Sequence, residues 1–144
     1  MALMHAERTH GDYGMTITDQ KGNTMMIDIP HEQGGAGQGL RPMQIILAAL
    51  CGCSSADVVS ILKKQRQELQ SLKILVDGER EQGKEPSLWQ SLKVVFEMTG
   101  DIDPAKAFRA AELSINKYCS VAETLRRAGA AITFTVIVNG NPVN

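Results

Sequence analysis

The side chains best suited to chemistry in this chain are three cysteines, Cys51, Cys53 and Cys119. Thiolates attack peroxides and disulfides, and they bind soft metal ions. Cys51 and Cys53 form a C-x-C pair inside a predicted helix, where positions two apart point about 200° away from each other. The two sulfurs therefore cannot share one ion or bond to each other, and each thiol must be considered alone.

Cys51 and Cys53 have different neighbours on that helix. Asp57 lies four residues after Cys53 and shares its face, whereas Cys51 shares a face with Leu50 and other small or apolar residues. Cys51 is therefore interpreted as a small buried hydrophobe.

Cys119 lies at the start of a later helix, just before the predicted cap Ser120. Unpaired N–H groups and the helix dipole would favour a thiolate there, provided that the sulfur faces them. An inert thiol buried between two helices remains an equal alternative on spacing alone.

Other site chemistries have weaker support. The chain has no HExxH or CxxC motif, and its three histidines all lie in the N-terminal part: His5, His10 and His31. Neither a metal nor a bound cofactor is therefore expected. The glycine-rich segment 34–39 does not match a dinucleotide or phosphate-binding motif and is interpreted as a flexible surface loop. The chain also lacks the GxSxG motif of serine hydrolases.

Composition limits the classes of function. With 144 residues, 43% of them hydrophobic, residues 1–144 are expected to form a single domain with a real core. The 15 basic and 16 acidic residues balance, so nucleic acid and membrane surfaces are not expected partners. The longest strongly apolar run, Ile45 to Cys53, is far shorter than the roughly 20 residues of a membrane-spanning helix. We expect a soluble, cytoplasmic protein.

The elements that must position the thiols begin with three strands at 3–9, 15–19 and 24–29, which the intervening turns join into an antiparallel meander. Pro42 then opens a helix that is predicted to run to about Gln67. Its first half is apolar on every side and needs cover that one meander cannot supply, which predicts an obligate homodimer with a large apolar interface.

The rest of the chain predicts two strands, two helices and a last strand. The strands are expected at 72–79 and 91–98. Asp103 and Pro104 are predicted to begin a helix that runs to about Asn116. An S-x-x-E capping box at Ser120 predicts a second helix over 121–128, and the last strand is expected at 131–138. The order β-β-β-α-β-β-α-α-β indicates an α+β fold.

Two segments of the chain closely resemble the two signatures of the OsmC/Ohr family of osmotically inducible and organic hydroperoxide resistance proteins. They are Arg41–Leu62 and Leu113–Val121, which place Cys53 and Cys119 66 residues apart. The resemblance implies antiparallel sheets around long central helices in an intertwined homodimer, with two sites at the dimer interface. It also implies that Cys53 attacks an organic hydroperoxide, that Cys119 resolves the product, and that a dithiol supplies electrons during an oxidative stress response.

One feature departs from the peroxidase members of that family. Those proteins have a Glu directly after the helix-opening Pro, and this Glu positions an Arg from the meander over the reactive thiol. Here the position is Met43, followed by Gln44, and the corresponding meander region has no Arg; Arg8 and Arg41 are the nearest candidates. The Met43 pattern, together with residues 78–80, looks more like the YhfA-like branch.

The leading hypothesis is a thiol-dependent peroxidase that reduces organic hydroperoxides through a Cys53 sulfenic acid and a Cys53–Cys119 disulfide. Two alternatives remain open. One is a non-enzymatic redox sensor that uses the same cysteine pair, and the other is a protein that binds a small apolar ligand between the long helices.

Overall fold

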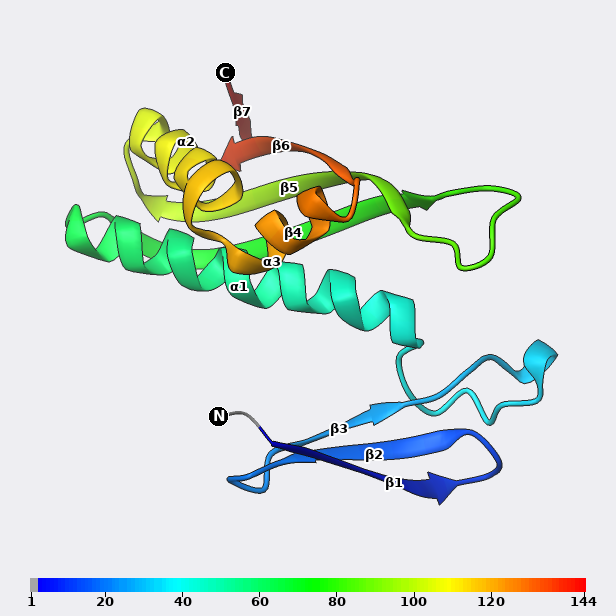
Figure 1. Ribbon diagram of the computed structural model, residues 1–144. Helices are drawn as coiled ribbons and strands as arrows, with labels where there is room; N and C mark the ends of the chain where they lie inside the picture. The colour runs from blue at the N-terminus through cyan, green and yellow to red at the C-terminus, as the bar shows by residue number, and fades with distance from the viewer. Residues whose placement is uncertain (1–2) are drawn as a thin grey trace. The chain divides into compact units, whose positions relative to one another are not determined.

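The computed structural model describes residues 3–144 of the chain. They form two compact units, and the boundary between the units follows Ala48, inside the long helix α1 (Pro42–Lys64). The first unit holds strands β1 (Met4–His10), β2 (Gly14–Asp19) and β3 (Thr24–Ile27). They pair antiparallel in the order β1-β2-β3, which confirms the predicted meander (Figure 1).

The glycine-rich segment that follows β3 is organised around a buried carboxylate. Asp28 Oδ1 accepts the N–H of Ile29 at 2.8 Å, and Asp28 Oδ2 accepts the N–H of Gln38 at 3.2 Å. The bond from Ile29 is the main cause that lowers the pKa of this carboxyl. A Cβ on Gly35 would lie 1.9 Å from the Ile29 carbonyl oxygen, so the tight path there requires glycine.

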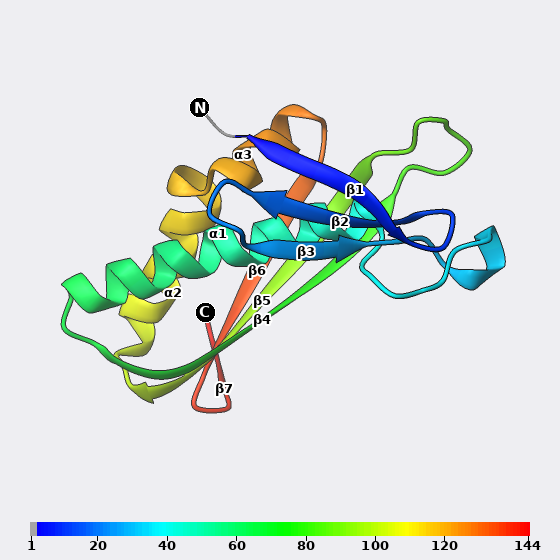
Figure 2. The same cartoon turned by 90° about the horizontal axis from the view of Figure 1, so that it is seen from below.

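The second unit contains a four-stranded mixed sheet in the order β4-β5-β6-β7. The long strands β4 (Glu68–Arg80) and β5 (Trp89–Asp101) are antiparallel, and β6 (Ala131–Val138) lies beside β5 (Figure 2). The β5–β6 pair is parallel, so the expectation of purely antiparallel sheets is wrong for this pair. The reason is that helices connect these two strands, and such a crossover returns the chain in its original direction.

A short strand, β7 (Asn141–Val143), completes this sheet and was not predicted. It pairs with β6 through a tight turn at Asn139 and Gly140, whose φ angles are 49° and 81°. Asn-Gly with positive φ at both positions is the preferred two-residue hairpin turn. That dipeptide was therefore a usable signal for the extra strand.

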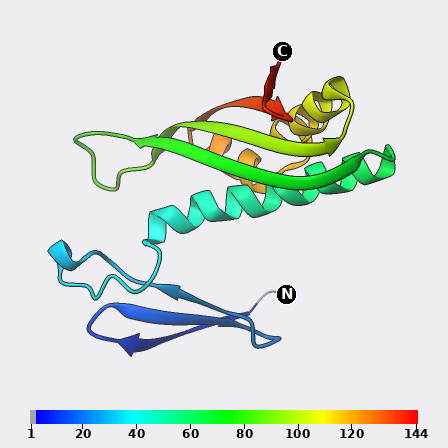
Figure 3. The same ribbon diagram turned by 180° about the vertical axis from the view of Figure 1, so that it is seen from behind.

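The helices of the second unit lie against one face of its sheet, where alternate side chains of β5 are buried (Figure 3). Helix α2 (Pro104–Leu113) begins after Asp103, whose side chain accepts the N–H of Ala105 at 2.9 Å, as the sequence predicts. A π-helical turn, η2 (Ser114–Tyr118), follows, and α3 (Ser120–Arg127) ends the crossover. The predicted helix to Asn116 thus changes type at Ser114.

Helix α1 ends at Lys64, three residues before the predicted Gln67, and Arg66 has a left-handed backbone with φ of 57°. A stripe of residues four apart is fully buried along α1: Leu50, Ser54, Val58 and Leu62. By length and composition α1 is apolar enough to cross a membrane, with a mean hydropathy of 2.1. The apolar run Ile45 to Cys53 underestimates the apolar length of α1, because small residues outside the run also keep the mean hydropathy high. Core helices of soluble proteins share this composition.

Candidate functional site

Three groups capable of chemistry come together in the second unit: Cys53, Asp57 and Cys119. Their sulfur and carboxylate oxygen atoms all lie within 4.8 Å of one another. Cys53 and Asp57 stand one turn apart on α1, and Cys119 lies between η2 and α3. The structure therefore brings together the two cysteines singled out in the sequence and adds a carboxylate from the same helix face as Cys53.

Ser114, which the sequence analysis did not single out, ties this site together. Its buried Oγ donates to Asp57 Oδ2 at 2.9 Å and to the Ser54 carbonyl at 3.4 Å. Its carbonyl accepts the N–H of Cys119 at 2.8 Å in the five-residue hydrogen bond of the π turn. One residue thus positions the carboxylate on α1 and the backbone of the second cysteine.

The residue that caps α3 is Cys119, so the prediction of Ser120 as the cap is wrong by one position. Cys119 Sγ accepts the N–H of Ala122 at 3.4 Å, and its carbonyl accepts the N–H of Glu123 at 3.0 Å. The π turn explains the shift, because its extra residue rotates the following chain relative to a continuous α-helix. The sulfur therefore does face the free N–H groups at the start of α3.

Burial nevertheless dominates the electrostatics of Cys119, a residue that is 2% exposed. It raises the pKa of the Cys119 thiol to about 11, and the hydrogen bond and charge of Cys53 add to the rise, while the Ala122 N–H opposes it. Of the two alternatives left open for Cys119, burial favours the thiol held between two helices over the thiolate. At neutral pH Cys119 is a neutral thiol.

Cys51 lies apart from this group, as the helix geometry requires. It lines a separate cavity of about 280 Å³ together with Leu72 and Ile74 of β4. Its side chain is half-buried, and burial raises the pKa of its thiol. Among residues 3–144, the sulfur-containing cluster includes Cys53 and Cys119 but not Cys51.

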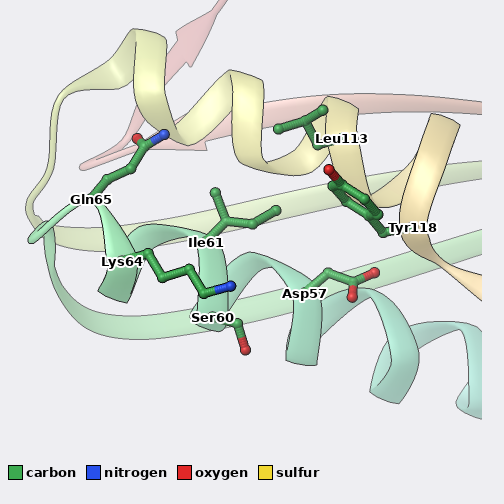
Figure 4. A pocket seen from close by; sticks show the side chains of 7 residues that line it. All are labelled: Asp57, Ser60, Ile61, Lys64, Gln65, Leu113 and Tyr118. Carbon is green, nitrogen blue, oxygen red and sulfur yellow. The ribbon is translucent and has the colours of Figure 1, made fainter.

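Two pockets of the second unit border the cluster. The larger, of about 540 Å³, runs between α1 and the end of α2, and Figure 4 shows Asp57 and Tyr118 on opposite sides of it. The smaller, of about 320 Å³, includes Cys119 and also Tyr118, which is 52% exposed. The larger pocket is lined by Asp57, Ser60, Ile61, Lys64, Gln65, Leu113 and Tyr118.

The two cations proposed from the sequence, Arg8 and Arg41, belong to the first unit. Arg8 and Arg41 are exposed residues of the first unit, whereas Cys53 belongs to the second. Gln44 Oε1 accepts the N–H of Arg41 at 3.1 Å at the start of α1. In the second unit, Arg126 donates to the Ile115 carbonyl at 2.8 and 2.7 Å and so holds the π turn.

Comparison with known proteins identifies the family. The model of the OsmC-like protein family matches residues 35–135, which include both cysteines of the cluster. The chain belongs to the OsmC-like family. The YhfA protein of Escherichia coli K12 is 42% identical to it over 88 residues, which are 60% of this chain and 65% of YhfA. The chain therefore spans a little under two thirds of the length of this curated relative.

Solved structures share the fold of this chain. A hypothetical protein from Aquifex aeolicus has a TM-score of 0.79 and 26% identity, covering 96% of this chain and 98% of its own. An organic hydroperoxide resistance protein OsmC from Legionella pneumophila has a TM-score of 0.71 and 16% identity, covering 96% and 97%. The OsmC-like fold is a soluble α+β fold, and this chain shares it.

Proposed function

We propose that this OsmC-like protein is a thiol-dependent peroxidase that reduces organic hydroperoxides. The observation that carries the proposal is the close approach of Cys53 and Cys119, whose sulfurs belong to a cluster of atoms within 4.8 Å of one another. Two sulfurs at this separation need to approach one another by about 3 Å at most to reach the roughly 2.0 Å of a disulfide bond. The name of the Legionella pneumophila structure agrees with a hydroperoxide as the substrate.

The proposed cycle starts at Cys53. Its thiolate attacks one peroxide oxygen, the O–O bond breaks, and a proton converts the departing alkoxide into an alcohol. The product is a Cys53 sulfenic acid. Cys119 then attacks this sulfur, water leaves, and a Cys53–Cys119 disulfide forms. An external dithiol returns two electrons and two protons to the pair, and becomes a disulfide itself.

The difference between the two cysteines supports this division of roles. Cys53 is half-buried and accessible to a small substrate, whereas Cys119 is buried and protonated at neutral pH. The charge of Cys53 is one cause that raises the pKa of Cys119. Conversion of Cys53 to a neutral sulfenic acid removes that charge, so Cys119 loses its proton more readily after the peroxide has reacted.

The pocket beside Asp57 suits the organic part of the substrate. Ile61, Leu113 and Tyr118 supply apolar surface in a cavity of about 540 Å³. Each buried CH₂ group of an alkyl hydroperoxide contributes about 0.8 kcal/mol of binding. Hydrogen peroxide lacks such a group and should be the poorer substrate.

The third member of the cluster, beside the two sulfurs, is the Asp57 carboxylate, which cannot serve as a cationic donor. A preorganised cationic donor would stabilise the developing negative charge on oxygen, and the loss of one such donor costs about 10²–10³ in rate. We therefore expect slow turnover by comparison with peroxidases that have the Glu–Arg pair. The proposal further includes a cytoplasmic homodimer that covers the apolar surface of α1, with no nucleic acid or membrane partner.

The test is peroxide consumption by reduced, purified protein, with cumene hydroperoxide or hydrogen peroxide as substrate and dithiothreitol or dihydrolipoamide as donor. Cys53→Ser should abolish the reaction, and Cys119→Ser should stop it after about one turnover when the donor cannot resolve the sulfenic acid. Cys51→Ser is the matched control and should retain the rate.

A rate for the unaltered protein no higher than that of Cys53→Ser would exclude the enzyme. Reversible formation of the Cys53–Cys119 disulfide without turnover would then favour the redox sensor. Binding of an apolar ligand that Cys53→Ser leaves intact would favour the carrier.

A further inference from the structure

The same three groups form a ligand set for a metal ion that no motif in the sequence indicates. We propose that reduced Cys53 and Cys119, together with Asp57, bind one soft divalent cation of the Zn²⁺ type, with a fourth coordination position open. We also propose that the bound cation inhibits peroxide reduction. This second part rests on the proposed function, whereas the cation site itself does not.

The donor types favour such an ion. Two thiolate sulfurs select zinc-like cations over magnesium and calcium, and a carboxylate oxygen is an established third ligand of Zn²⁺. Sequence motifs did not reveal the set, because one cysteine lies 66 residues after the other and no histidine takes part. Cys51 and Cys53, the pair that resembles a motif, are the wrong pair for one ion.

The spacing requires only a small movement. In a tetrahedral site with zinc bonds of 2.0–2.3 Å, ligand atoms lie roughly 3.5–3.8 Å apart. The three ligand atoms here already lie within 4.8 Å of one another. A contraction of about 1.3 Å at most is therefore needed, and rotation of the Cys53 and Asp57 side chains on one helix face can supply it.

The ligands are also held from outside, as in metal sites generally. Ser114 Oγ donates to Asp57 Oδ2, which leaves the other carboxylate oxygen for a cation. The Ala122 N–H donates to Cys119 Sγ at 3.4 Å and helps to neutralise a thiolate there. The Ser114 carbonyl fixes the backbone of Cys119, so the ligands from both helices share one anchor.

The charge of the site favours a cation. Two thiols that can lose protons stand next to a carboxylate, and Arg126 is engaged with the Ile115 carbonyl. Binding of Zn²⁺ displaces two thiol protons and leaves two zinc–sulfur bonds, with no change in oxidation state. The sulfur electrons that would attack a peroxide are then shared with the metal, so the bound ion should inhibit oxidation of Cys53.

Three protein ligands leave one tetrahedral position for a water molecule or a small ligand. The two pockets that border the cluster give access to it, and Tyr118 lines both. The Cys53 side chain is half-buried, so exchange of the ion with a chelator should be possible without unfolding. This arrangement fits a reversible inhibitory ion better than a permanent structural one.

The test is a titration of the full-length, reduced, chelator-treated protein with Co²⁺, followed by competition with Zn²⁺ against a chromophoric chelator. We expect one cation per chain and a thiolate-to-cobalt charge-transfer absorption. Cys53→Ser and Cys119→Ser should remove that absorption, and Asp57→Asn should weaken binding at least about 10-fold. Ser114→Ala, which removes only the support of a ligand, should cost about 10–100-fold in affinity. Cys51→Ser is the control and should bind as the unaltered protein does.

Failure to bind Zn²⁺ at micromolar free concentration, or equal binding by Cys119→Ser and the unaltered protein, would overturn the site. Peroxidase activity in the absence of such binding leaves the proposed function intact and refutes only the cation site. Binding without peroxidase activity in the chelated protein refutes the proposed function alone. If both are present, equal turnover with and without Zn²⁺ would refute the inhibition.

Discussion

The hydrogen bond between Ser114 and Asp57 should measurably stabilise the second unit. Ser114 is fully buried, and its Oγ donates to Asp57 Oδ2 at 2.9 Å. A hydrogen bond to a charged group contributes about 1.5–3 kcal/mol. Ser114→Ala should therefore lower the free energy of unfolding by about this amount, which corresponds to a fall in Tm of roughly 5–10 °C for a chain of this size.

A double-mutant cycle separates this bond from the rest of the Ser114 environment. In an Asp57→Ala background, Ser114→Ala removes only the neutral contact with the Ser54 carbonyl and should cost about 0.5–1.5 kcal/mol. Urea denaturation at one fixed protein concentration measures each variant, and Ser60→Ala, an exposed serine of the same helix, is the control. If Ser114→Ala costs the same in both backgrounds to within about 0.5 kcal/mol, the coupling does not exist.

Three further predictions concern the thiols and the assembly. Mild oxidation should link Cys53 to Cys119 and leave Cys51 free, which peptide mapping can check; a bond to Cys51 would contradict the assignment. The pKa of Cys119 is raised to about 11, so the rate of alkylation of this thiol in chelator-treated protein should rise about tenfold per pH unit up to that value. At pH 8 the rate should be about 100-fold lower than for a thiol of pKa 9. A plateau of the rate below pH 9 would refute the burial argument. Sedimentation at micromolar concentration should give a dimer, since only 22% of the apolar window of α1 is buried within the chain, and a stable folded monomer would contradict this.

Local signals predicted much of the fold. The meander follows from turn residues between short strands. The start of α2 follows from Asp103, whose side chain caps the helix by accepting the N–H of Ala105, as expected. The parallel pairing of β5 with β6 depends on how the crossover returns, which no short window of sequence contains. Strand β7 is different, because the Asn139–Gly140 turn is a local signal for the hairpin that contains it.

The candidate site also combines features that local sequence signals predict with features that depend on distant parts of the chain. Its cysteines stand out by type, and Asp57 by its spacing from Cys53 on one helix face. No local sequence signal identifies Ser114, because its role depends on a hydrogen bond to Asp57, which lies 57 residues away on α1. The sequence left the state of Cys119 open, because helix geometry indicates the favourable N–H groups but not the burial, which has the larger effect on the pKa.

The π turn before Cys119 makes the number of residues in this segment as important as their types. Cys119 donates its N–H to Ser114 across five positions rather than the four of an α-helix. Removal of one residue between them would restore ordinary α-helical spacing and rotate everything downstream by about 100°, which would carry the second sulfur away from the first. Substitutions that preserve the length leave this geometry intact. A gap in an alignment at this turn is therefore a sharper sign of a lost cysteine pair than any exchange of side chains within it.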